Sequence, residues 1–230
     1  MTTKKTGMIR AAGLSGLCFV LLLAVSGARG QNTAPAAPGS VVRQGALHYG
    51  VFMAGGFGTG DNSSTKFLNG GGQVGFVLTP NYGPSILKGN FEMGAEVIPF
   101  WQAYEPHKPD LFVKNGVVVA TTAGGTYTGI ALTPVILRWN FAHGQSRLVP
   151  WAQGAGGLLY TTRKFPLPGT SVWNFEPQFG VGAHYFLNDR HSIDFGANAI
   201  HISNASLADR NSGVNALVQF QLGYTWWKKK

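Results

Sequence analysis

The sequence predicts an all-β protein, an eight-stranded antiparallel transmembrane β-barrel. One observation behind this prediction is an N-terminal segment with the three parts of a secretory signal. Another is a series of eight segments in which apolar residues alternate with polar or small ones. The third is the composition: the chain has 33 glycines, 12% aromatic residues and only 12% charged residues, whereas about a quarter of the residues of a soluble domain are charged. Together they favour a barrel of the Gram-negative outer membrane over a soluble sandwich.

The N-terminal segment has the order of a signal peptide. Basic residues come first, an apolar run follows, and small residues end it: Lys4, Lys5, Arg10, 14–25 and 26–28. We therefore predict that residues 1–30 are a signal peptide, cleaved after Ala28 or after Gly30. The apolar run is too short to span a bilayer as a helix. Because Cys18 lies inside the run, the mature chain should contain no thiol, disulfide or cysteine ligand.

Three further parts follow the signal peptide. Residues 31–45 are rich in Pro, Ala and Gly and are predicted to be a flexible lead-in, residues 46–227 to form the barrel, and residues 228–230 to be a basic tail. Removing the signal peptide takes four positive charges from the formal net charge of +9, which leaves +5, three of them in the tail. No basic patch is interleaved with aromatic residues, so we predict no nucleic-acid partner. A basic exterior suits an anionic membrane surface equally well.

The eight expected strands are defined by period-2 alternation. Their ranges are 46–58, 69–79, 89–103, 125–141, 147–162, 172–187, 190–203 and 213–227. In the sixth segment Phe175, Phe179 and Val181 share one face, with polar residues between them. In the third segment the same parity places Val97 and Trp101 on the apolar face, which should contact lipid.

The connections between these segments orient the barrel. With both termini in the periplasm, the inner turns are 80–88, 142–146 and 188–189. The outer loops are then 59–68, 104–124, 163–171 and 204–212. The outer loops are longer on average, as in bacterial outer-membrane barrels. The seventh segment therefore ends at the outer surface.

The end of the seventh segment carries the candidate chemistry. His201 and Ser203 are two residues apart, so in an extended strand their side chains project from one face. A base beside a hydroxyl can activate it as a nucleophile, and the amide of Asn204 could stabilise the oxyanion that forms when an ester carbonyl is attacked. The pair shares its parity with Ile193 and Phe195, so we expect it to face lipid. A polar pair on such a surface is costly unless function retains it.

The segment His201-Ile202-Ser203-Asn204-Ala205 and the following Asn211-Ser212-Gly213 resemble a known family, the lipid A 3-O-deacylases of the PagL type. Weaker matches are Leu137-Arg138-Trp139-Asn140-Phe141, 154–160 and 174–182. The resemblance extends over roughly residues 89–227. It implies an eight-stranded outer-membrane serine esterase that removes the 3-linked hydroxyacyl chain of lipid A, with its active site at the outer leaflet.

The resemblance also implies residue roles. His201 matches the general base, Ser203 the nucleophile and Asn204 an oxyanion donor. The family carries a Glu two residues after the turn glycine, where this sequence has Asn215. An Asn can orient a histidine by hydrogen bonding but brings no charge to stabilise the imidazolium. The family also has a glycine where this sequence has Ser206.

Strand parity bears on the third member of this triad. Strict alternation places Asn215 on the interior face together with Gln219 and Gln221. Only a bulge or an irregular turn near Gly213 would bring residue 215 to His201.

Other polar residues are interpreted as structural. Glu92, Glu96 and Glu176 fall on the interior parity with Arg138 and are expected to form an ion-pair network that fills the barrel. Three further histidines lack the spacing of metal ligands: His48, His184 and His191. We therefore predict no bound metal and no cofactor.

Two functions of different classes remain open. The first is the lipid A esterase, whose partners would be lipopolysaccharide and the membrane. The alternative is a non-catalytic structural or adhesion barrel, a degenerate relative that has lost the triad acid. A pore is disfavoured because side chains just fill an eight-stranded interior. The sequence does not identify which acyl chain is cut or whether the barrel forms a homodimer.

Overall fold

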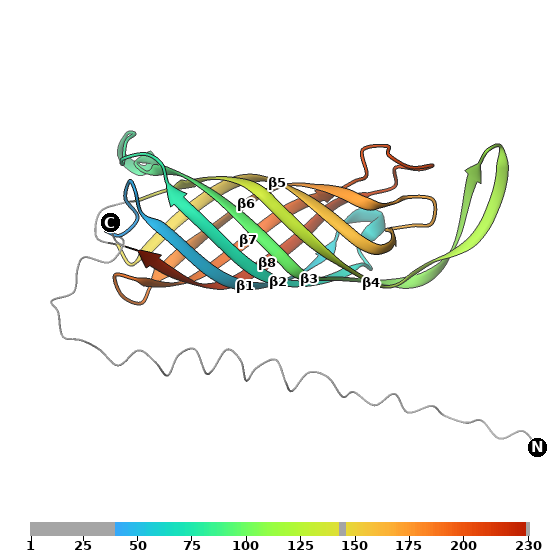
Figure 1. Ribbon diagram of the computed structural model, residues 1–230, viewed down its shortest axis with the longest axis horizontal. Coiled ribbons are helices and arrows are strands. Elements are labelled where there is room, and N and C mark those ends of the chain that lie inside the picture. Colours follow the sequence, from blue (N-terminus) through green and yellow to red (C-terminus); the bar gives the residue numbers. More distant parts are fainter. Residues whose placement is uncertain (1–39, 143–145, 229–230) are drawn as a thin grey trace, which may run out of the picture. The chain divides into compact units, whose positions relative to one another are not determined.

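The structure is a computed structural model that describes residues 40–142 and 146–228. Eight antiparallel strands follow one another around a closed barrel, and β8 closes on β1 (Figure 1). The strands are β1 (Leu47–Gly58), β2 (Lys66–Val77), β3 (Asn90–Lys114), β4 (Val117–Asn140), β5 (Leu148–Phe165), β6 (Ser171–Phe186), β7 (His191–Ile202) and β8 (Val214–Lys228). Two 3-10 turns, η1 (Gly60–Asn62) and η2 (Ser85–Leu87), lie in connections. The predicted all-β, eight-stranded fold is confirmed.

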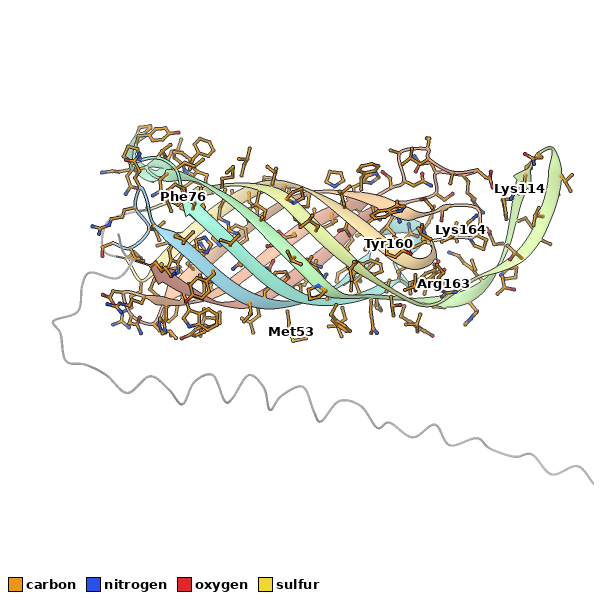
Figure 2. The ribbon with its side chains drawn as sticks, in the orientation of Figure 1. Met53, Phe76, Lys114, Tyr160, Arg163 and Lys164 are labelled. Carbon is orange, nitrogen blue, oxygen red and sulfur yellow. The ribbon has the colours of Figure 1, made fainter. Side chains whose placement is uncertain are left out.

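Apolar side chains cover the outer face of the strands, and polar ones face inward except where an apolar cluster fills one part of the interior. In β6, Phe179 and Val181 are 61% and 50% exposed, whereas Glu176 is 5% exposed. Figure 2 shows Met53 and Phe76 projecting outward from the barrel wall. This arrangement suits a wall with lipid outside, because apolar side chains meet the hydrocarbon and the closed ladder leaves no strand edge open.

The interior is joined by a hydrogen-bonded network around Glu92. Arg138 Nη1 donates to Glu92 Oε1 at 3.0 Å, and His48 Nε2 lies 2.9 Å from the same oxygen. Asn140 Nδ2 donates to Glu92 Oε2 at 2.9 Å. Among the described residues, no ion pair joins Arg138 to Glu96 or Glu176, although both carboxyl groups are buried. The charged network is therefore smaller than the sequence suggested.

The segment 104–124, predicted to be a loop, is instead mostly strand. β3 continues to Lys114 and β4 begins at Val117, joined by a turn at Asn115 and Gly116, whose φ angles are 50° and 78°. The resulting β3–β4 hairpin extends past the other strands at the outer end (Figure 1). Pairing from Lys108 with Ala123 to Lys114 with Val117 satisfies backbone groups that a loop would leave to water.

The predicted lipid-facing position of Trp101 is wrong. Trp101 is 2% exposed in the interior, whereas its neighbour Phe100 is 40% exposed. The reason is a β-bulge: Gly70 and Gly72 of β2 pair with Phe100 and Val97 of β3, which gives β3 one extra residue. An extra residue reverses the parity of everything beyond it.

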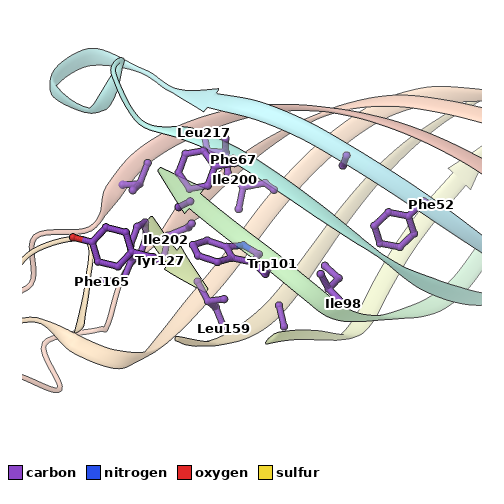
Figure 3. Packing of buried hydrophobic residues seen from close by; sticks show 14 residues of the cluster. Phe52, Phe67, Ile98, Trp101, Tyr127, Leu159, Phe165, Ile200, Ile202 and Leu217 are labelled. Carbon is purple, nitrogen blue, oxygen red and sulfur yellow. The ribbon is translucent and has the colours of Figure 1, made fainter. Parts of the chain in front are cut away.

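Trp101 belongs to an apolar cluster that fills the outer half of the barrel (Figure 3). Its ring centroid lies 5.2 Å from that of Phe165, which lies 4.9 Å from that of Tyr127. Ile200 and Ile202 of β7 join the same cluster. The inward face of β7 is thus anchored directly beneath the residues of the candidate site.

The two ends of the chain are described in part. The predicted signal peptide and residues 31–39 of the lead-in lie outside the described residues. Val41 and Val42, in the part of the lead-in that is described, are buried in a cluster with Val77, Val149, Phe186 and Trp227. Lys228 is the last residue of β8, while Lys229 and Lys230 also lie outside the described residues.

Removal of the Arg138 side chain should destabilise the barrel. Arg138→Ala leaves the buried Glu92 without its permanent cation, and we expect the free energy of unfolding to fall by about 3–5 kcal/mol. Urea titration in lipid vesicles measures this. Adding Glu92→Gln should recover part of the loss, whereas the exposed control Lys114→Ala should change little. An unchanged unfolding midpoint for Arg138→Ala would contradict the role of this ion pair.

Candidate active site

β7 places His201 and Ser203 on the outer face of the barrel. Ile200 and Ile202, which alternate with them, are 7% and 0% exposed in the interior. His201 and Ser203 are both half-buried on the opposite side. Farther along the same outward face, the side chain of Ile193 is 36% exposed.

Ser203 is fixed at the end of the ladder by β6. Ser203 N–H donates to Phe175 O at 3.1 Å, and Phe175 N–H donates to Ser203 O at 2.7 Å. Residues paired in this way project from the same face of a sheet. Phe175 is 39% exposed, so the hydroxyl of Ser203 lies beside an apolar, lipid-facing ring.

Two cavities in the described part of the interior are too small for a lipid substrate. Two interior cavities, one beside Trp151 and His184 and one beside Glu96 and Glu176, each have a volume of about 10 Å³. Such a volume holds about one water molecule. An acyl chain can therefore reach a nucleophile on the outer face but not one in these cavities.

Asn204 organises the turn that follows Ser203. Its side chain is buried, with Nδ2 donating to Arg210 O at 3.0 Å and Oδ1 accepting from Ser206 N–H at 3.0 Å. Its backbone N–H donates to Asn211 Oδ1 at 3.3 Å. Of the two amide N–H groups of Asn204, one is used in the bond to Arg210 O.

The turn contains two residues in the left-handed region. Ala205 has φ 49° and Ser206 has φ 64°. L-residues with a Cβ rarely adopt this conformation, whereas glycine does so at no steric cost. This backbone would suit a glycine at position 206, so Ser206 depends on the bonds around Asn204.

A β-bulge brings residue 215 opposite His201. Ile200 pairs with Leu217 and Ile202 pairs with Val214, so His201 of β7 faces two residues of β8, Asn215 and Ala216. Strict alternation does not hold across such a bulge. The interior position predicted for Asn215 therefore does not follow, although the side chain of Asn215 lies outside what the structure describes.

Sequence reasoning missed two residues that support this site. Arg210 and Asp110 are 100 positions apart, yet they form an ion pair at 2.8 Å beside the turn of Asn204. No local spacing could have indicated this contact. Among residues 40–142 and 146–228, no three His, Cys, Asp or Glu side chains are grouped to hold a metal ion.

The position of Ser203 predicts its chemical accessibility. A Ser203→Cys variant should react with a thiol reagent dissolved in the lipid phase, because the side chain lies on the outer face beside Phe175. An interior control, Ser192→Cys, should react far more slowly, since Ser192 is fully buried. Labelling of the variants in lipid vesicles, followed by mass spectrometry, checks this. Equal protection of both cysteines would contradict the outward position.

Comparison with known proteins assigns the family. A family model described as lipid A 3-O-deacylase (PagL) matches residues 90–225, which is more than half of the chain. No curated protein matches in sequence. The fold is similar to OprG from Pseudomonas aeruginosa, with 9% identity over 82% of this chain and 98% of that chain and a TM-score of 0.50. It is also similar to Neisserial surface protein A, with 11% identity over 80% and 99% of the two chains and a TM-score of 0.50.

The crystal structure of the outer membrane enzyme PagL aligns with 16% identity over 76% of this chain and 97% of that chain, with a TM-score of 0.43. At these identities, similarity to solved structures concerns the fold alone. The family model carries the assignment, because it covers β3 to β8 and includes His201, Ser203 and Asn204. The chain belongs to the lipid A 3-O-deacylase (PagL) family.

Proposed function

We propose that this protein is an outer-membrane serine esterase that removes the 3-O-linked hydroxyacyl chain from lipid A. The observation that carries the proposal is the location of His201 and Ser203, on the outer face of the barrel at the end of β7, within the residues matched by the family model. The proposal places the ester bonds of lipid A beside this end of β7. The substrate can therefore approach laterally, through the membrane.

The proposed reaction has two steps. Ser203 Oγ attacks the ester carbonyl while His201 takes its proton, and the tetrahedral intermediate collapses to an acyl-serine. His201 returns the proton to the departing sugar oxygen. Water, deprotonated by His201, then attacks the acyl-serine carbonyl, the bond to Ser203 Oγ breaks, and His201 returns the proton to Ser203 Oγ as the hydroxy fatty acid is released. These steps need no metal or other cofactor, and they need no second protomer.

Asn204 and Asn215 would assist His201 and Ser203. The remaining amide N–H of Asn204 would donate to the oxyanion, provided that the turn holds it toward the carbonyl. Asn215, opposite His201 in the bulge, would orient the imidazole by a hydrogen bond. Without a carboxylate at this position the imidazolium is less stabilised, so this enzyme would be slower than one with the family's Glu.

The alternative is a non-catalytic structural or adhesion barrel. One specific feature favours it: Asn215 stands where the family has its triad acid. Asp209, the acidic residue nearest to Asn215 in the sequence, has its carboxylate 3.6 Å from the ammonium group of Lys114. An ion pair with Lys114 leaves Asp209 less suited to orient His201. An esterase would lower the mass of lipid A by one hydroxyacyl chain, whereas a non-catalytic barrel would leave the mass unchanged.

Removal of either reactive side chain should abolish the reaction. Because neither half of a Ser-His pair works alone, Ser203→Ala and His201→Ala should each remove nearly all of the chemical step, roughly 10⁴-fold or more. The barrel should still fold, since both side chains lie outside the core. Mass spectrometry of lipid A from cells that produce each variant measures the effect, and heat-modifiable migration on gels reports folding. Full deacylation by Ser203→Ala would refute the nucleophile assignment, and no mass change with the wild-type protein would favour the alternative.

Substitutions at residue 215 test whether Asn215 or another group orients His201. If Asn215 orients His201, Asn215→Ala should lower the rate roughly 10-fold or more, while Asn215→Glu should retain or raise it, because a carboxylate stabilises the imidazolium. The rate of hydroxy fatty acid release by the purified variants measures this. An unchanged rate for Asn215→Ala would mean that another group, with Asp209 the first to test, orients the histidine.

A further inference from the structure

One arginine, Arg210, connects the turn after Ser203 to two other segments at the same end of the barrel. Arg210 Nη1 donates to Asp110 Oδ2 on the β3–β4 hairpin at 2.8 Å, and Arg210 Nε donates to Ser212 Oγ at 3.2 Å. Its backbone N–H donates to Gly169 O in the β5–β6 connection at 3.1 Å. Its carbonyl accepts from Asn204 Nδ2 at 3.0 Å. Asn204, the neighbour of the proposed nucleophile, is therefore bonded to Arg210. Arg210 is in turn bonded to the β3–β4 hairpin and to the β5–β6 connection.

The environment of this arginine restrains its side chain. Its guanidinium carbon lies 5.4 Å from the centre of the Phe112 ring, within range of a cation–π contact. A Cβ added to Gly169 would lie 2.8 Å from Phe112 and 3.1 Å from Arg210, so a larger residue at position 169 would require these side chains to shift. The φ of 82° at Gly169 favours glycine as well.

A second ion pair between the same two segments gives a comparison. The side chains of Arg210 and Asp110 are only 21% and 10% exposed, with their charged atoms 2.8 Å apart. Those of Lys114 and Asp209 are 50% and 38% exposed, and the distance is 3.6 Å. Exposed pairs with long separations contribute little, whereas partly desolvated pairs with short, charge-assisted hydrogen bonds are stronger. The ion pair between Arg210 and Asp110 is therefore the main link between the β3–β4 hairpin and the turn after Ser203.

We propose that Arg210 is a positioning residue for the active site, acting through Asn204 on Ser203, and that Asp110 fixes it in place. The turn needs such support because Ala205 and Ser206 adopt left-handed backbone angles. Non-glycine residues persist in that region only where the surrounding structure holds them. The carbonyl of Arg210 holds Asn204, and Asn204 Oδ1 in turn holds the N–H of Ser206. The β3–β4 hairpin is thereby coupled to the geometry around the nucleophile.

This inference rests on the proposed esterase activity for its kinetic test. Arg210→Ala and Asp110→Ala should each lower kcat roughly 10- to 100-fold, because small displacements of reacting groups have effects of this size. KM should change by less than about 2-fold, since neither side chain is expected to contact substrate. The reversed pair Asp110→Arg with Arg210→Asp should recover part of kcat, and the control Lys114→Ala should stay within about 2-fold of the wild type. Hydroxy fatty acid release from lipid A by the purified protein in detergent gives both constants.

A second measurement does not depend on activity. In Arg210→Ala, amide hydrogen exchange at Asn204 and Ser206 should accelerate at least about 10-fold, while exchange at Phe175, in the neighbouring ladder, should stay unchanged. Unchanged exchange at Asn204 and Ser206 would overturn the proposal, as would an unchanged kcat. A lowered unfolding midpoint of the whole barrel, with loss of kcat in proportion, would indicate a structural role and would also overturn it. If the wild-type protein releases no fatty acid, the proposed function fails, and the exchange measurement still decides the role of Arg210.

Discussion

The requirement that every backbone polar group find a partner in lipid determines most of this structure. A sheet that crosses a membrane cannot leave an edge open, so β8 must pair with β1. With eight strands the enclosed space is just wide enough for side chains. Polar groups in that space must then satisfy one another, as Arg138, His48 and Asn140 do around Glu92. The filled interior in turn leaves the outer face as the surface that a lipid can reach.

The candidate site lies at the end of β7, and its residues keep the packing and the ladder hydrogen bonds of the barrel. Ile200 and Ile202 pack into the outer apolar cluster, and this packing fixes the orientation of the residues between and beyond them. Ser203 closes the last pair of ladder hydrogen bonds with Phe175. A nucleophile at this point has a rigid backbone on one side and a turn on the other. The turn is the less regular of the two, because it contains two residues with left-handed backbone angles.

β-Bulges in β3 and β8 change which side chains face inward near the outer end of the barrel. In β3 an extra residue turns Trp101 inward, where it fills the space beneath the outer loops. In β8 an extra residue places Asn215 and Ala216 together opposite His201. Such irregularities are common at barrel rims and beside functional sites. They also show why the parity of a strand is reliable only between bulges.

The sequence by itself determined the fold class, the approximate strands, the inward position of Glu92, Glu96 and Glu176, and the outward position of His201 and Ser203. It could do so because period-2 alternation and motif spacing are local properties of the chain. Only the tertiary structure decided the hairpin beyond Tyr104, the inward turn of Trp101, the bulge at residue 215 and the contact of Arg210 with Asp110. Each of these depends on which residue of another strand or loop lies opposite. That register is set by long-range pairing, which no local pattern in the chain records.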